Sequence, residues 1–161
     1  LPLMMGGVTL LVPLLLSMDP KNANMSAALK KLVVWICPVM SFVMTNAILL
    51  IGLGYSIPVP LIVCVLVGLM LMAIGNYLPK TKQSYTMGIR LPWTLHSEEN
   101  WNRTHRLAGK LWMLGGLLMI LCGFLTQYFP SGWLVTAVFV GIMGLIFVPT
   151  LYSLWLYKKG I

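Results

Sequence analysis

Long apolar runs, separated by short polar segments, divide the chain into five parts. They cover residues 1–18, 32–54, 57–78, 107–128 and 132–157. Each approaches or exceeds the roughly 20 apolar residues that a helix needs to cross a bilayer. Barrel strands would instead alternate apolar and polar residues, and the runs show no such alternation. The pattern predicts an all-α, polytopic integral membrane helix bundle, with residues 1–161 forming one membrane domain of five spans.

Charged residues occupy alternate connections between these runs. The 11 basic and three acidic residues lie before the second run, between the third and fourth runs or after the fifth, with Lys110 just inside the fourth. Short loops rich in Lys and Arg stay on the cytoplasmic side of a membrane. The distribution therefore predicts that Leu1 starts outside and Ile161 ends inside. The net charge of +8 then reflects topology and contact with membrane lipid, including anionic lipid as a candidate partner. No soluble basic face is left for direct nucleic-acid binding.

Polar chemistry is sparse within the runs. No Asp, Glu or His lies in their apolar bodies, which disfavours a coupled transporter because ionisable residues in membranes usually mark ion or proton pathways. Cys37, Cys64 and Cys122 lie in three different runs without metal-binding spacing, and we interpret them as small apolar side chains. Pro149 should loosen one helical hydrogen bond, which Ser153 is placed to satisfy.

The start at Leu1, without methionine or a basic leader, indicates a truncation or the first ordered residue of a longer chain.

The connection between the third and fourth runs holds most of the candidate chemistry. Residues 88–110 contain both histidines, all three arginines and two of the three acidic residues. Pro79 should end the third span, and residues 79–96 show no helical period. Their aromatic and apolar side chains predict an ordered loop packed on the helix ends. Trp93 and Trp101 suit the membrane interface, with the ring buried and the N–H in water.

A helix should begin directly after this loop. Ser97 has the position of an N-cap, and Glu98 and Glu99 in the first turn favour the positive helix end. Glu99 and Arg103 are four residues apart in the better orientation for an ion pair. The helix should continue into the fourth span. We expect His105 to bond to the loop above it, and Arg90 to pair with an acid or with helix-terminal carbonyl groups.

Two chemical alternatives remain for the same segment. His96, Glu98, Glu99 and His105 contain metal-binding atoms, but their spacing is poor, so we expect no metal and no cofactor. An interfacial enzyme or lipid-handling protein using His105, Arg90 and Glu98 or Glu99 is chemically feasible. It has no evident nucleophile beyond Thr104 and Ser97, and we assign no catalytic residue.

Four motifs in fixed order resemble a known family. They are N-Y-x-P-K at 76–80, G-I-R-x-P-W-T at 88–94, E-E-x-W at 98–101 and T-H-R-L-x-G-K at 104–110. Residues 75–112 closely resemble the signature region of SdpI-type immunity proteins. The opening run resembles the span that follows an extracytoplasmic loop in longer members. The resemblance thus implies that the first of six spans and this loop are missing here.

The resemblance implies a location and a role. The family is found in the bacterial cytoplasmic membrane, and its named members protect a producer from its own secreted peptide toxin. They can also bind a cytosolic transcription repressor when toxin is present. A cytoplasmic signature loop at 79–106 would then report the toxin. The candidate partner-binding or conformational residues are Asn76, Pro79, Lys80, Tyr85, Gly88, Arg90, Pro92, Trp93, Thr94, Glu98, Glu99, Trp101, Thr104, His105, Arg106 and Gly109.

Overall fold

The computed structural model describes residues 27–83, 88–129 and 132–160, together with Gly7, Leu10, Leu11 and Leu14. The first apolar run otherwise lies outside the described residues, as does Tyr85. Within the described ranges, ordered structure is entirely helical. The elements are α2 (Ala27–Gly52), α3 (Val59–Tyr77), the short 3₁₀ helix η2 (Leu78–Lys80), α4 (Pro92–His96), α5 (Glu98–Leu125) and α6 (Gly132–Lys158).

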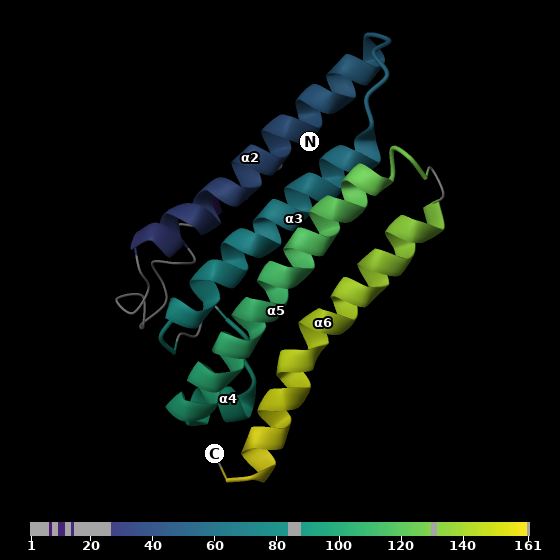
Figure 1. Cartoon of the computed structure of the whole chain (residues 1–161). Helices are drawn as coiled ribbons and strands as arrows, with labels where there is room; N and C mark the ends of the chain where they lie inside the picture. The colour runs from purple at the N-terminus through teal and green to yellow at the C-terminus, as the bar shows by residue number, and fades with distance from the viewer. Residues whose placement is uncertain are drawn as a thin grey trace.

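Four long helices run alternately up and down and form the body of the molecule (Figure 1). The α3–α5 pair is central, with α2 packed on α3 and α6 packed on α5. All four are long and apolar enough to cross a membrane. Their outer faces carry large exposed apolar side chains such as Phe42, Leu117 and Phe147, as expected of surfaces that face lipid. The prediction of an all-α, multi-pass membrane protein is thus confirmed for the part of the chain that the structure describes.

A seam of glycines joins α3 to α5. Gly68 and Gly75 on α3 are seven residues apart, and Gly109, Gly116 and Gly123 repeat the same spacing on α5. A Cβ atom on Gly68 would lie 2.6 Å from the carbonyl oxygen of Gly116, and one on Gly75 would lie 2.9 Å from that of Gly109. Small residues let membrane helices approach until their backbones touch. The seam therefore fixes the register of the two central helices.

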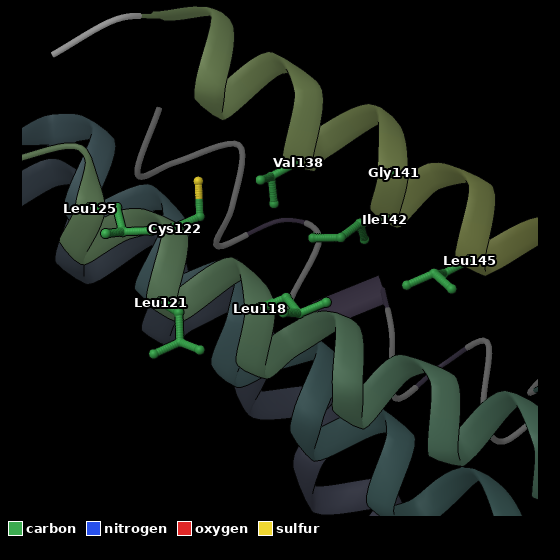
Figure 2. Close-up of a pocket in the computed structure, with 8 residues that line it drawn as sticks. All are labelled: Leu118, Leu121, Cys122, Leu125, Val138, Gly141, Ile142 and Leu145. Atoms are coloured by element: carbon green, nitrogen blue, oxygen red, sulfur yellow. The ribbon is translucent and has the colours of Figure 1, made fainter. Parts of the chain in front are cut away.

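The α5–α6 interface is close at one end and open at the other. A core of Cys64, Leu71, Met119 and Ile142 fills the middle of the bundle. Beyond it, near the end of α5 and the start of α6, the helices leave an apolar groove of about 390 Å³ (Figure 2). It is lined from α5 by leucines and a cysteine, and from α6 by Val138, Gly141, Ile142 and Leu145.

Charged residues gather at the opposite end from this groove. The start of α2, the end of α3, the start of α5 and the end of α6 meet there (Figure 1). All charged residues in the described ranges except Lys110 belong to these helix ends or to the connection between η2 and α5, and Lys110 lies near the middle of α5. The alternation seen in the sequence thus becomes one charged end of the bundle.

Candidate functional site

A buried histidine holds the connection between η2 and α5 against the start of α5. His105 is 1% exposed, and its ring stacks on Trp101 with 4.0 Å between ring centroids. The backbone N–H of Ile89 donates to His105 Nε2 at 3.0 Å, while Nδ1 lies 2.8 Å from the carbonyl oxygen of Trp101. Since Nε2 must accept, Nδ1 carries the proton and the imidazole is neutral. We call the contact of Gly88 and Ile89 with Trp101 and His105 the histidine latch; the predicted bond from His105 to the loop is confirmed.

Gly88 allows the loop to come this close. Its φ is +111°, a conformation that side-chain-bearing residues rarely adopt. A Cβ atom here would lie 2.5 Å from His105 Nε2 and 2.8 Å from the nearest ring carbon of Trp101. Both the backbone angle and the space therefore require glycine.

Thr94 folds the loop after Gly88 into a compact turn. Its side chain is fully buried, and its Oγ1 accepts the N–H of Leu91 at 2.9 Å. The same hydroxyl lies 2.9 Å from the carbonyl oxygens of Ile89 and Leu91, to either of which it can donate. Pro92 occupies the first turn of α4 and leaves Leu91 extended, as expected for a residue before proline. The absence of a helix predicted for residues 79–96 was wrong, because η2 and α4 both form there.

Two further side chains tie the loop to its surroundings. Gln83 Nε2 donates to the carbonyl oxygens of Thr94 and Leu95 at 2.9 and 3.2 Å. The Nε1–H of Trp101 donates to the carbonyl oxygen of Thr81 at 3.0 Å. The sequence-based interpretation that this N–H faces water was wrong, because the ring lies beneath the loop. Trp93 stacks on Tyr157 of α6, and its Nε1 atom is buried as well.

Next to the latch, a buried polar network connects α5 to α6. Asn100 is completely buried; its Nδ2 donates to the carbonyl oxygen of Ser153 at 3.1 Å and its Oδ1 accepts from Ser153 Oγ at 2.7 Å. Thr104 Oγ1 also donates to Asn100 Oδ1, at 3.1 Å. Ser153 thus bonds across helices, whereas the sequence suggested a local role beside Pro149. The sequence analysis missed Asn100, although it lies one helical turn before Thr104 and two before Ala108 on the same buried face of α5.

The acidic residues lie at the start of α5, where the contacts are local to the helix. Ser97 Oγ accepts the N–H of Asn100 at 3.2 Å, so the predicted N-cap is confirmed. The predicted ion pair between Glu99 and Arg103 is present as well, with both side chains about half exposed. Glu98 and Arg90 are exposed.

This arrangement does not bring metal ligands or an acid–base pair together. Among the described residues, no three His, Cys, Asp or Glu side chains lie close enough to hold a metal ion. Both ring nitrogens of His105 contact backbone groups rather than Glu98 or Glu99. The geometry is that of a closed structural contact.

The remaining candidates lie where α3 ends against α5. A Cβ atom on Gly109 would be 2.5 Å from Pro79 Cγ, so Gly109 makes room for the proline. Lys80 Nζ lies 3.5 Å from Asn76 Oδ1, and Arg106 is exposed. The site thus contains Asn76, Pro79, Lys80 and Gly109 at the seam, and the latch residues above it.

Comparison with known proteins matches this part of the molecule. The model of the SdpI/YfhL protein family matches residues 80–153. This match and the curated relative described next support membership of this family. Immunity protein SdpI of Bacillus subtilis (strain 168) is 29% identical over 124 residues, which cover 75% of this chain and 56% of that protein. The chain thus spans just over half the length of this curated relative. No solved structure matches it significantly.

The region matched to the SdpI/YfhL family coincides with the latch and its supports. It begins at Lys80, at the end of η2, and ends at Ser153, the α6 partner of Asn100. It therefore includes the loop, all of α5 and most of α6. The polar contacts described above are all formed within it or at its border.

Proposed function

We propose that this protein is a membrane immunity protein that protects a bacterium against a secreted peptide toxin. The observation that carries the proposal is the similarity to immunity protein SdpI over 75% of the chain. The site favours a binding and signalling role, because its buried polar groups form the hydrogen bonds that hold the loop in place. A closed contact of this kind suits a protein that changes conformation better than an enzyme that turns over a substrate.

The proposal includes an orientation in the bacterial cytoplasmic membrane. The charged end is basic, and short basic connections remain on the cytoplasmic side. The latch and the C-terminus would then face the cytoplasm. The apolar groove between α5 and α6 would lie in the outer half of the membrane, on the side from which a secreted toxin arrives.

Signalling to a cytosolic repressor would act through the latch, whose opening the repressor would detect. A ligand shifts a two-state equilibrium only by binding the two states with different affinity. Toxin binding that tilts α6 would strain the bonds between Asn100 and Ser153, and the stack of Trp93 on Tyr157. Both contacts adjoin the latch, so release of the loop would uncover the buried Trp101 and His105 and would move the exposed Arg90, which changes the surface offered to a partner.

An interfacial enzyme using His105 is the alternative function. Its general base would need a free ring nitrogen within hydrogen-bond reach of a substrate proton. The Ile89 N–H occupies Nε2, and Nδ1 faces a backbone carbonyl group. The enzyme would require the latch to open first. Turnover of a lipid or peptide by the purified protein, lost with His105→Ala, would favour this alternative.

A survival assay tests the immunity proposal. The intact gene is expressed in a strain that lacks its own immunity genes and is challenged with a panel of secreted, membrane-active peptide toxins. We expect survival to rise for at least one toxin, and His105→Ala and Arg90→Ala to lower this survival without abolishing membrane insertion. Arg103→Ala is the matched control, because Arg103 is exposed and paired only within α5. Unchanged survival across the panel would contradict the proposal.

A further inference from the structure

The segment Thr104–Lys110 combines residues that the latch explains with residues that it does not. Thr104, His105 and Gly109 point inward and are buried in the contacts described above. Arg106 and Lys110 are exposed on the outer face of α5. Neither has an ion pair or hydrogen bond among the described residues. Their charges therefore serve no internal contact of the described structure.

Helix geometry places these two cations beside the end of α3. Gly75 and Gly109 face each other across the seam. In two antiparallel right-handed helices, the residues that follow such a facing pair lie on the same side of the pair. This places Asn76 of α3 and Lys110 of α5 side by side at about the same height. Lys80 and Arg106 are about one turn, or roughly 5–6 Å, closer to the charged end.

We call Asn76, Lys80, Arg106 and Lys110 the basic patch. All four side chains are exposed. Lys80 is held 3.5 Å from the Asn76 amide oxygen and 5.3 Å from the centre of the Tyr77 ring, and neither neutralises its charge. Three cations thus share one face.

Described acidic residues do not compensate this face. The described acidic residues are Glu98 and Glu99, which lie eight and seven residues, or about 12 and 10 Å, before Arg106 along α5. The Glu99 carboxylate is already paired with Arg103. The excess positive charge therefore belongs to the patch itself.

Directly beyond the patch, the same face becomes apolar. Met113, Leu114 and Leu117 follow Lys110 on the outer side of α5, and they are 41%, 51% and 46% exposed. Leu69 continues this apolar surface on α3 and is 53% exposed. Cations at the edge of a lipid-facing apolar surface lie at the depth of the lipid headgroups.

We propose that the basic patch binds the phosphate group of an anionic phospholipid, whose acyl chains lie along the adjoining α3–α5 face. The Arg106 guanidinium can bind two phosphate oxygens at once, and Lys80 and Lys110 add point charges. The Asn76 amide can donate a further hydrogen bond. A lipid fits better than free phosphate, because the site is an open surface whose remaining contacts are apolar. This inference does not depend on the immunity role.

Lipid binding can be measured on the full chain in nanodiscs. Native mass spectrometry or lipid extraction would compare bound phosphatidylglycerol with phosphatidylcholine at equal bulk amounts. Each cation near a membrane surface accounts for about a fivefold change in affinity for anionic lipid, so Arg106→Gln with Lys110→Gln should lower it about 25-fold. The matched control is Lys158→Gln with Lys159→Gln, which removes the same charge at the end of α6, where Lys159 lies over the Trp155 ring.

The pattern across variants decides the proposal. We expect selective retention of phosphatidylglycerol in the natural protein and the control, and its loss in the patch variant. Equal losses in both double variants would overturn the proposal, since the effect would then be that of total charge. So would displacement of the lipid by inorganic phosphate at millimolar concentration, because a phosphate site needs no acyl chains. Unchanged helicity by circular dichroism would exclude misfolding of the patch variant.

Discussion

Gly88 is the position where one added methyl group should disturb the latch most. Alanine here meets His105 Nε2 at 2.5 Å and Trp101 at 2.8 Å, and the backbone keeps an unfavourable φ of +111°. Strained backbone conformations cost about 1–3 kcal/mol. Loss of the bond between the Ile89 N–H and His105 costs about 1–3 kcal/mol more if the groups stay buried. Gly88→Ala should therefore destabilise the closed loop by about 2–6 kcal/mol.

Hydrogen–deuterium exchange in nanodiscs would measure this cost. At the lower bound, the amides of residues 88–97 should lose protection about 30-fold, while the amides of α3 and α5 stay protected. Gly54→Ala is the matched control. Gly54 also has a positive φ, of +91°, but a Cβ atom there meets nothing within 4 Å, and the turn lies at the other end of the bundle. The reasoning is wrong if Gly88→Ala leaves the protection of residues 88–97 unchanged, as Gly54→Ala should.

Three other changes test the supports of the site and its orientation. Asn100→Ala leaves two buried hydroxyl groups without their acceptor, so it should lower the free energy of unfolding by about 1–3 kcal/mol. Thermal or denaturant unfolding would measure this loss. The control Asn102→Ala changes a residue on the exposed face and should leave the free energy of unfolding unchanged. Gly116→Ala places a methyl group 2.5 Å from a carbonyl oxygen of α3 and should destabilise the bundle far more than Gly141→Ala, which meets nothing within 4 Å. In a background without natural cysteines, Gln127→Cys should react with an impermeant thiol reagent added outside, and labelling only from inside would reverse the topology.

The sequence predicted those features that depend on local pattern. Apolar runs of membrane length identified the long helices, because the energetic demand of the bilayer is strong and continuous along the chain. The Ser97 cap and the pair of Glu99 with Arg103 followed from spacing within one helical turn. His105 was expected to bond to the loop, since a polar ring at the start of a span needs a nearby partner.

Contacts between distant segments could not be read in the same way. Asn100 bonds to Ser153, 53 residues later, and nothing near either residue specifies that pairing. The glycines of the seam recur every seven residues in each helix, which the sequence shows. Which glycines face one another, however, depends on which helices are neighbours. The N–H of Trp101 was expected in water because interfacial tryptophans usually lie there; the loop supplies the Thr81 carbonyl oxygen instead.

The strengths of the contacts suggest why latch and bundle can respond separately. The α3–α5 seam brings backbone against backbone over several turns, so its register changes only if the helices separate. The latch rests on a few hydrogen bonds and one ring stack, and a typical bond contributes only about 0.5–1.5 kcal/mol net. Its opening would therefore cost a small part of what unfolding costs. A modest movement of α6, transmitted through Ser153 and Asn100 to the turn that carries Trp101, would be enough to shift the loop between closed and released states.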